Sequence, residues 1–531
     1  MSFYAEICKK ILSHEKASKQ DIHRWKIQLC RTYKFSDIPS NSDIIANIPD
    51  SYSEELKKKL ILLLQRKPMR TIAGVAIVAV MTSPKSCPHG KCLPCPGGPV
   101  FDSPQSYTGF EPAAMRAKMH DFDPFKQVQA RIYQLHCIGH PTDKIDLIIM
   151  GGTFTARTPW YQTWFVKRCY DALNNQDSSS LYEAMRYNEQ ANHRCIGLTV
   201  ETRPDWFRLQ QVDQTLSYGA TRVELGVQTT YDNILFGIKR GHTVSDTIAA
   251  TRIAKDVGLK VCYHMMPGLP GSNESLDKQA FQTIFSQSDY KPDMLKIYPC
   301  LVIEGTALYD LWKAQEFSPL SSDEASRQIA EILSGIPEWV RVQRIQRDVP
   351  AQYIDSGVTK SNLRQMVDEV LDKRGLSSLD LRNRELGHVS LKNQEPIDLS
   401  EVVMKQIQYT ASGGTEVFLS LMTKPSKAVI GYLRLRMIEN AHRQELNKGS
   451  VAMIREVKVV GQELEIGQKS EGSIQHRGFG TQLIHEAERI SEEEFDQKQL
   501  FVLSGVGVKE YYRKYHQFLD NGVYLWKKIG K

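Results

Sequence analysis

The stretch Cys87-Pro-His-Gly-Lys-Cys92-Leu-Pro-Cys95-Pro-Gly-Gly98 decides how the rest of the chain is interpreted. Three cysteines fall within nine residues, and the surrounding prolines and glycines exclude a helix or a strand. We therefore predict a loop that brings three thiolates to one place. The apolar run at residues 72–80 is typical of a buried strand. The loop then leaves the end of a strand, where barrel and open α/β enzymes keep their chemistry.

The sequence downstream of the loop predicts a parallel sheet. Short β-branched runs recur roughly every 25–70 residues, and helical patterns separate them. Alternation of this kind is typical of parallel strands joined by right-handed crossovers, and about six or seven units suit a full or partial (β/α) barrel. The predicted strands are residues 72–80, 144–150, 195–200, 222–227, 260–264, 294–298 and 340–345.

Several of these strands end in glycine-rich or polar signatures. They are Met150-Gly-Gly-Thr-Phe154, Glu201-Thr-Arg-Pro-Asp205, Gly226-Val-Gln228 and His264-Met-Met-Pro-Gly268. Each one alone is typical of ordinary turn chemistry. Because these four signatures lie at the same end of successive strands, together they predict the mouth of one barrel.

The N-terminal 70 residues predict a separate helical module. Helical patterns occupy residues 4–12, 22–30 and 53–65, and Ser40-Asn-Ser-Asp43 is predicted to be a turn or loop. The module carries 14 Lys and Arg against 8 Asp and Glu, which accounts for most of the net charge of +7. Such an excess favours a polyanionic partner, although a solvated helical face has the same composition.

A second domain is expected after a polar linker at residues 387–396. Strand-like runs at residues 416–421, 428–436, 450–460 and 500–503, with an amphipathic helix at residues 481–492, predict an antiparallel-rich α+β domain. Arg434-Leu-Arg436 alternates as an exposed strand would. The predicted domains are therefore residues 1–70, 71–386 and 387–531.

The composition is that of an ordinary globular chain. The 531 residues predict three or four domains, with 41% apolar and 24% charged residues. Long apolar runs and a signal-peptide pattern are both missing, so we expect a cytoplasmic protein with no membrane contact. The ten cysteines favour a reducing compartment. Seven outside the loop are predicted to be small buried hydrophobes: Cys8, Cys30, Cys137, Cys169, Cys195, Cys262 and Cys300.

The cysteine loop is compatible with three kinds of site. A structural zinc site needs four ligands, and His89 is the nearest candidate for the fourth. A redox C-x-x-C pair explains Cys92 and Cys95 but leaves Cys87 idle. A 4Fe-4S cluster held by three cysteines leaves one iron open, which can chelate S-adenosylmethionine. Three thiolates at a barrel mouth favour this third interpretation.

Several segments resemble the family of the Elongator catalytic subunit, from about residue 65 to the C-terminus. The resemblance rests on the cysteine loop and on residues 70–81, 105–112, 150–154, 201–205, 240–244 and 295–299. It implies a radical S-adenosylmethionine partial (β/α) barrel with a helical N-terminal module. It also implies a 4Fe-4S cluster on Cys87, Cys92 and Cys95, with Gly151 and Gly152 contacting the cofactor. The x4 gap after Cys87 is shorter than in eukaryotic subunits, which suggests a prokaryotic-type, stand-alone protein.

A second motif, Gln475-His-Arg-Gly-Phe-Gly480, resembles the acetyl-coenzyme A loop of the GNAT acetyltransferases. Glycines before a helix let backbone N–H groups approach a pyrophosphate. The resemblance implies a C-terminal α+β GNAT domain with Tyr512 as its catalytic residue. It places acetyl-coenzyme A contacts at Lys144, Glu456, Val457, Lys458, Val459, Gln475, Gly478, Phe479, Gly480, Thr481 and Tyr512. Lys514-Tyr-His-Gln-Phe518 lacks the glycine that the family carries there.

Together the two resemblances imply one reaction. A 5′-deoxyadenosyl radical takes a hydrogen from the methyl group of acetyl-coenzyme A. The carbon radical adds to C5 of the wobble uridine in a tRNA anticodon stem-loop, and hydrolysis of the thioester leaves 5-carboxymethyluridine. The base is expected to be unstacked into the barrel mouth, with phosphates held by the basic N-terminal helices.

Two other function classes stay open from the sequence. One is a protein-lysine acetyltransferase with a structural iron–sulfur domain, and the other is a tRNA-binding scaffold with decayed sites. The intact cysteine set and the motif at residues 475–480 oppose decay. The sequence leaves open whether Elongator-type subunits bind and which oligomer forms, with a homodimer as one candidate.

Overall fold

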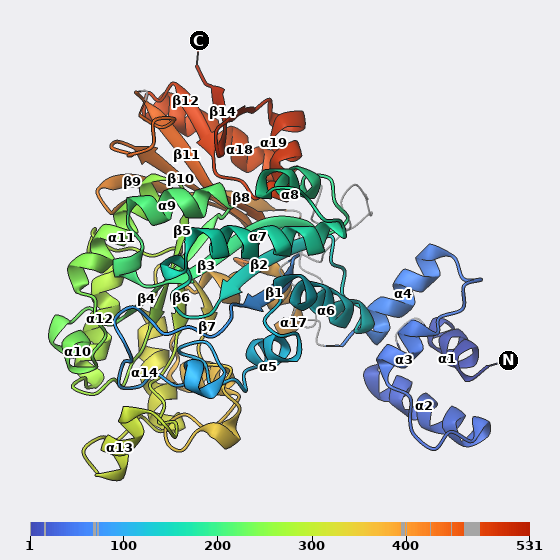
Figure 1. Cartoon of the computed structure of the whole chain (residues 1–531). Coiled ribbons are helices and arrows are strands. Elements are labelled where there is room, and N and C mark those ends of the chain that lie inside the picture. Colours follow the sequence, from blue (N-terminus) through green and yellow to red (C-terminus); the bar gives the residue numbers. More distant parts are fainter. Residues whose placement is uncertain are drawn as a thin grey trace.

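Two seven-stranded sheets and a lobe of N-terminal helices make up the fold (Figure 1). The computed structural model describes residues 2–14, 17–66, 71, 74–393, 399, 401–424, 426–447, 449–460 and 478–530. None of the helices in these ranges combines the length and the apolar character needed to cross a bilayer.

The first sheet is a half-barrel of parallel strands that follow one another in chain order. Its strands are β1 (Ala76–Met81), β2 (Lys144–Met150), β3 (Arg194–Thr202), β4 (Arg222–Gln228), β5 (Lys260–Met265), β6 (Met294–Ile297) and β7 (Arg341–Arg344). All seven predicted strands are present. β1 and β7 are the two edges of the sheet, so the barrel is partial.

Helices cover the outer face of the half-barrel (Figure 1). The helices of this part of the chain are α5 (Pro112–Met119), α6 (Pro124–Cys137), α7 (Pro159–Asn174), α8 (Leu181–Asn188), α9 (Leu209–Ser217), α10 (Asp232–Gly237), α11 (Val244–Asp256), α12 (Glu274–Ser286), α13 (Ala307–Lys313), α14 (Ser322–Ser334), α15 (Leu363–Arg374) and α16 (Leu381–Arg384). Capping boxes begin α11 and α14, at Thr243 with Asp246 and at Ser321 with Glu324. Val223 and Leu225 of β4 pack under the helices, so the alternate positions of β4 face the hollow of the half-barrel.

The second sheet is mixed, with the order β13-β14-β12-β11-β10-β9-β8. Its strands are β8 (Val402–Ala411), β9 (Gly414–Thr423), β10 (Val429–Ile438), β11 (Val451–Val459), β12 (Gln499–Val502), β13 (Leu519–Asn521) and β14 (Tyr524–Lys528), accompanied by α18 (Phe479–Arg489) and α19 (Lys509–His516). Only β11 and β12 pair in parallel. The sequence patterns located four of these strands and α18, but they missed β8, β13, β14 and α19.

The predicted linker at residues 387–396 is wrong over most of its length. A helix, α17 (Leu386–Asn393), occupies this region in the described part of the chain. Leu386 and Val389 pack against the apolar core of the second sheet, which stabilises the helix despite its polar residues.

The prediction that Arg434-Leu-Arg436 is an exposed strand is also wrong. Arg434 and Arg436 are 1% and 0% exposed, because this face of β10 packs against the half-barrel. Arg436 Nη2 lies 2.5 Å from Asp256 Oδ1 of α11. Arg455 of β11 lies 2.5 Å from Asp293 Oδ1, just before β6. The alternating charges are therefore buried, and they pair across the two sheets.

Glu416 of β9 completes this buried ion network. Its carboxylate lies 2.8 Å from Arg455 Nη2 and 3.0 Å from Lys255 Nζ of α11. Burial raises the pKa of Glu416, but Arg455 and Lys255 outweigh it and lower the pKa from 4.5 to about 2. The network therefore holds ionised carboxylates between the two sheets.

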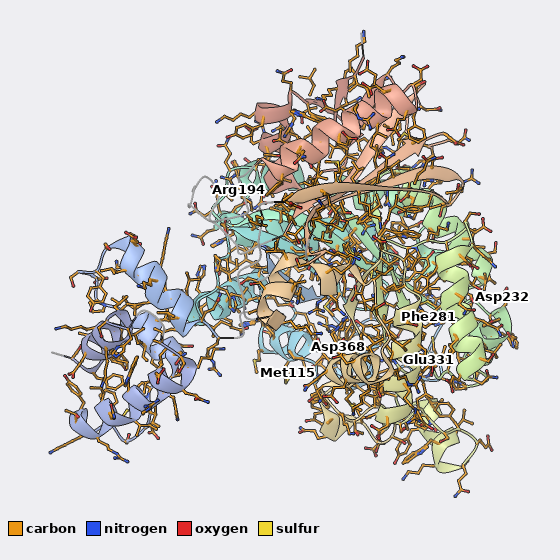
Figure 2. The ribbon with its side chains drawn as sticks, turned by 180° about the vertical axis from the view of Figure 1, so that it is seen from behind. Met115, Arg194, Asp232, Phe281, Glu331 and Asp368 are labelled. Carbon is orange, nitrogen blue, oxygen red and sulfur yellow. The ribbon has the colours of Figure 1, made fainter. Side chains whose placement is uncertain are left out.

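The N-terminal helices form a lobe beside the two sheets (Figure 2). They are α1 (Phe3–Leu12), α2 (Lys19–Tyr33), α3 (Asn41–Ala46) and α4 (Glu54–Leu64). The predicted turn at residues 40–43 is wrong, because Ser40 caps α3 and forms a capping box with Asp43. Gln65 Nε2 donates to the carbonyl of Gly139 at 3.1 Å, which attaches the lobe to the half-barrel.

The cysteines outside the loop are mostly buried. Six of the seven are buried and Cys137 is half-buried, and all ten cysteines of the chain are free. They are small apolar side chains of the core, as predicted.

Glu416→Gln tests the ion network. We expect the free energy of unfolding at pH 7 to fall by about 3–5 kcal/mol, because the substitution leaves buried cations without their carboxylate. The native pKa lies below the unfolded value, so the contribution is complete above about pH 4.5 and is lost as the pH falls toward 2. Urea unfolding of both proteins across this pH range measures the difference.

The matched control is Glu274→Gln. Glu274 lies 2.8 Å from Lys278, but its side chain is 62% exposed. A surface pair of this kind contributes about 0–1 kcal/mol. Equal losses in the two variants would contradict a stabilising role for the buried network.

Candidate active site

One cavity of about 960 Å³ connects the cysteine loop to the second sheet. Cys87, Cys92 and Cys95 line it together with Lys458 and Tyr512. The cavity follows the inner face of the half-barrel, where it is lined by the alternate β4 residues Arg222, Glu224, Gly226 and Gln228. The structure thus brings residues from both predicted cofactor sites to one cavity.

Hydrogen-bond donors surround the three sulfurs. Gln105 Nε2 lies 3.2 Å from Cys95 Sγ, and Ser106 Oγ lies 3.3 Å from the same atom. Thr153 Oγ1 lies 3.5 Å from Cys87 Sγ, and Arg240 Nη1 lies 3.8 Å from Cys92 Sγ. Such donors stabilise sulfurs that carry negative charge.

Burial and nearby cations act in opposite directions on these thiols. Burial raises the pKa of Cys87 and of Cys92, whereas Arg240 lowers both. The Cys87 and Cys92 thiols also each feel the charge of Cys95, so the three sulfurs lie close together. A cationic group bound among them would be needed to hold all three as thiolates.

His89 is committed to hydrogen bonds within the loop. Its Nδ1 meets the Arg203 guanidinium, which can only donate, so Nδ1 accepts. The other ring nitrogen, Nε2, then carries the proton and donates to Cys92 Sγ at 3.1 Å. His89 is therefore a donor to a sulfur, an arrangement that disfavours it as a fourth zinc ligand.

The glycine pair after β2 lets the backbone pass close to the loop. Gly151 has φ 131°, and a Cβ there would lie 2.1 Å from Thr82 Oγ1. Gly152 has φ 83° and lines the cavity, whereas Gly151 supports the bend behind it. The two glycines leave room beside the cysteines for a bound molecule.

The middle of the cavity holds a buried charged cluster, to which the sequence patterns assigned no function although Glu201 and His264 begin two of the predicted strand-end signatures. Lys296 of β6 contacts Glu224 of β4, and its Nζ lies 3.4 Å from Glu201 Oε1 of β3. His264 Nε2 lies 2.8 Å from Glu224 Oε2, and Tyr107 donates to Glu201 at 2.6 Å. A lysine or glutamate inside an apolar strand run signals such a cluster, because a buried charge needs a partner.

Lys296 argues against a metal ion at this cluster. Ligand atoms of Glu224, Cys262 and His264 lie within 4.8 Å of one another. However, the ammonium group of Lys296 already contacts the Glu224 carboxylate. Burial lowers the pKa of Lys296, but Glu224 outweighs it and raises the pKa above its usual range. A metal cation would have to displace this ammonium group.

At the far end of the cavity, β11 continues beyond its partner strand. β12 pairs with β11 only from Val451 to Ile454. The register between β10 and β11 skips Arg455, which marks a β-bulge there. Glu456, Val457 and Lys458 line the cavity, and Val459 ends the strand. The edge of β11 beyond Ile454 therefore has no strand beside it in the described part of the chain.

The first turn of α18 lies beside this strand edge. Gly478 precedes the helix with φ 83°, and Phe479, Gly480 and Thr481 follow. A Cβ on Gly480 would lie 3.7 Å from Val459 Cγ2 and 3.0 Å from the Tyr511 hydroxyl. The N–H groups of a helix N-terminus form an anion-binding position.

Three other predicted residues fall in different places. Tyr512 of α19 is buried and lines the cavity, and its hydroxyl has no hydrogen-bond partner among the described residues. Burial raises its pKa. Lys144 begins β2 and pairs in register with Arg194 of β3. Figure 2 labels Arg194 where the half-barrel meets the C-terminal layer. Lys144 does not line the cavity. Gln475 lies outside the described residues.

Family models match three parts of the chain. The ELP3 N-terminal domain matches residues 1–72, the Radical SAM superfamily matches residues 87–281, and the Radical SAM C-terminal domain matches residues 292–373. These matches agree with the parallel half-barrel and the cysteine loop.

Curated relatives and a solved structure span nearly the whole chain. The "tRNA uridine(34) acetyltransferase" of Methanocaldococcus jannaschii is 51% identical and covers 93% of this chain and 92% of its own. Human "Elongator complex protein 3" is 39% identical, with 99% and 96% covered. The structure of Methanocaldococcus infernus Elp3 lacking residues 1–46 has a TM-score of 0.77 and 47% identity, covering 86% of this chain and all of its own.

Gly151→Ala tests the close passage beside the cysteine loop. We expect the free energy of unfolding to fall by about 3 kcal/mol, because a methyl group there overlaps Thr82 and strains the backbone. Thermal unfolding measures the loss. In a Thr82→Ala background the loss should shrink, since the overlapping hydroxyl is gone.

Gly271→Ala is the control, because Gly271 also has a positive φ, of 84°, but nothing lies within 4 Å of its added Cβ. This substitution should cost about 1–2 kcal/mol, from backbone strain alone. Similar losses at the two glycines would show that the Thr82 contact is unimportant.

Proposed function

The chain belongs to the family of the tRNA uridine(34) acetyltransferases and Elongator complex protein 3, and we propose that it converts the wobble uridine of tRNA to 5-carboxymethyluridine. Relatives that carry these names are 51% and 39% identical over nearly the full chain. The main support for this proposal is that one cavity connects the cysteine loop to β11 and α19. Two cofactors bound at its two ends would meet inside it.

The cysteine loop fits a 4Fe-4S cluster. Its three sulfurs lie close together, each has a hydrogen-bond donor or cation nearby, and His89 is engaged elsewhere. Three cysteines leave one iron free for S-adenosylmethionine, and the bound pair supplies a carbon-centred radical that can take hydrogen from a methyl group. Gly152 lines the cavity beside the cysteines and gives the ligand room.

The far end of the cavity supports acetyl-coenzyme A binding by a GNAT domain at residues 387–531. The free edge of β11, at Glu456 to Val459, offers backbone groups to a pantetheine arm. The N-terminus of α18, at Phe479 to Thr481, offers N–H groups to a pyrophosphate. Tyr512 lines the cavity, and its hydroxyl would donate to the coenzyme A sulfur.

We propose the following roles for the other predicted contact residues and for the N-terminal module. Gly478 and Gln475 would border the pyrophosphate, and Lys144 would reach acetyl-coenzyme A from the half-barrel. The N-terminal module at residues 1–70 would bind tRNA phosphates, and the radical domain would span residues 71–386. We propose that the chain acts in the cytoplasm. We also propose that it is a prokaryotic-type, stand-alone member of the family, in line with the short gap after Cys87 and with the archaeal relatives.

Cys92→Ala tests the radical chemistry. After anaerobic reconstitution with iron and sulfide, the variant should lack the cluster absorbance, because two thiolates replace three. With S-adenosylmethionine, acetyl-coenzyme A and tRNA it should form no 5-carboxymethyluridine above background. Mass spectrometry of the nucleosides measures the product.

Cys169→Ala is the control, since Cys169 is also buried but lies in the apolar core under α7. It should keep both cluster and product. Product formation by cluster-free Cys92→Ala protein would refute the proposal, and preferential acetylation of lysine peptides would favour a protein acetyltransferase instead.

Tyr512→Phe tests the acetyl-coenzyme A end of the cavity. We expect kcat/KM for acetyl-coenzyme A to fall about tenfold, because one hydrogen bond to the sulfur is lost. The control is Tyr515→Phe on the same helix, where the side chain is 64% exposed and lies outside the cavity lining. Equal kinetics for the Tyr512 variant and the native protein would remove this residue from the site.

A further inference from the structure

His264 is the side chain of the central cluster with a free basic atom. Its Nε2 lies 2.8 Å from Glu224 Oε2, and its Nδ1 has no hydrogen-bond partner among the described residues. The ring lines the cavity and is 15% exposed. The edge of the Tyr298 ring packs against it at 5.4 Å between centroids, which limits its rotation.

The Glu224 carboxylate fixes the tautomer of this ring. Burial raises the pKa of Glu224, but Lys296, His264 and Arg222 outweigh it and hold the pKa well below its usual range. Glu224 is therefore ionised and can only accept a hydrogen bond, so Nε2 carries the proton. The lone pair is then on Nδ1, on the side of the ring away from Glu224. A carboxylate–imidazole pair of this kind activates hydroxyl nucleophiles in unrelated hydrolases.

Charged side chains of the neighbouring strands form the surroundings of His264. Glu201 and Glu224 carry two negative charges, and Lys296 supplies one positive charge between them. Arg222 also approaches Glu224, at 3.5 Å, but it is shared with Asp146 at 3.2 Å. The cations of the cluster therefore pair with its carboxylates, and the hydrogen bond from Nε2 to Glu224 joins His264 to them.

His264 lies between the two ends of the cavity. On β5, Lys260 faces the second sheet, where it senses the charge of Glu456, and Met266 follows His264 toward the cysteine loop. His264 lies four positions along the strand from Lys260, or about 13 Å. The acyl end of acetyl-coenzyme A would extend from β11 into this region, toward a radical formed at the cysteines.

We propose that His264 is the general base that activates water for hydrolysis of the thioester attached to the modified uridine. Glu224 is a positioning residue that orients the ring. This inference rests on the proposed function, whose product is a carboxylate and so requires loss of coenzyme A.

The step balances without an oxidant or a reductant. Water oxygen bonds to the thioester carbonyl carbon while one water proton passes to His264 Nδ1. The tetrahedral intermediate then collapses, the carbon–sulfur bond breaks, and the Nδ1 proton passes to the departing sulfur. The products are the carboxylic acid, which ionises in water, and the free thiol of coenzyme A.

His264→Ala, in the full reconstituted protein with S-adenosylmethionine, acetyl-coenzyme A and tRNA, tests the proposal. We expect 5-carboxymethyluridine to fall at least about 100-fold, the loss typical of a missing general base. The coenzyme A thioester of the modified uridine should accumulate instead. 5′-Deoxyadenosine should stay within about twofold of the native amount, and added imidazole should restore product, since it can occupy the vacated space.

Glu224→Gln should lower the rate of the same step while leaving KM for acetyl-coenzyme A unchanged. The matched control is His442→Ala, because His442 Nε2 also lies 2.8 Å from a carboxylate, that of Asp213, but outside the cavity lining. This control should accumulate no thioester. Thermal unfolding and iron content of each variant identify a folding defect.

Three results would overturn the proposal. Native amounts of product from a folded His264→Ala protein would show that no base is needed at this position. If the His264→Ala protein formed neither 5′-deoxyadenosine nor the thioester, His264 would act in the radical steps instead. Thioester accumulation that imidazole leaves unchanged would reduce His264 to a positioning role. A native protein that forms no modified uridine would instead refute the proposed function, so the two failures are distinguishable.

Discussion

The buried ion network between the two sheets is the constraint on which the cavity depends. Arg436 and Arg455 reach from the second sheet to Asp256 and Asp293 of the half-barrel. Breaking one such pair costs several kcal/mol because it leaves a charge buried alone, so the sheets cannot slide past one another freely. Apolar packing alone would tolerate small shifts; paired charges with short contacts specify one arrangement. That arrangement aligns β11 with the open interior of the half-barrel.

Within the cavity, the pairing of buried charges also orients a side chain that can react. Lys296 and two carboxylates satisfy each other in the interior, and they leave His264 with one committed and one free nitrogen. At the cysteine loop, neutral and cationic donors are directed at sulfur. His264 Nδ1 in the half-barrel and the Tyr512 hydroxyl at the far end of the cavity have no hydrogen-bond partner among the described residues, so they stay available to ligands.

The sequence predicted the half-barrel well because its strands are continuous apolar runs with glycine or polar residues at their ends. It also located the three cysteines, the glycine pair after β2 and the start of α18. It failed where tertiary partners override local pattern: Arg434 and Arg436 alternate like surface residues, yet their partners come from α11 and the start of β6. Short strands such as β13 carry no periodic signal at all. The Glu224–His264 pair joins two strands 40 residues apart, which spacing along the chain cannot reveal.

The bulge at Arg455 changes which side chains of β11 face the half-barrel. Met453 faces the half-barrel and Ile454 faces the core of the second sheet. The extra residue turns the alternation by one step, so that Arg455 enters the ion network and Glu456 still reaches Arg434. In a regular pairing without this bulge, Glu456 and every residue that follows it on β11 would lie on the opposite face of the sheet. The bulge therefore lets two consecutive charged side chains of β11 reach the half-barrel, while Ile454 and Val457 on either side of them pack in the core of the second sheet.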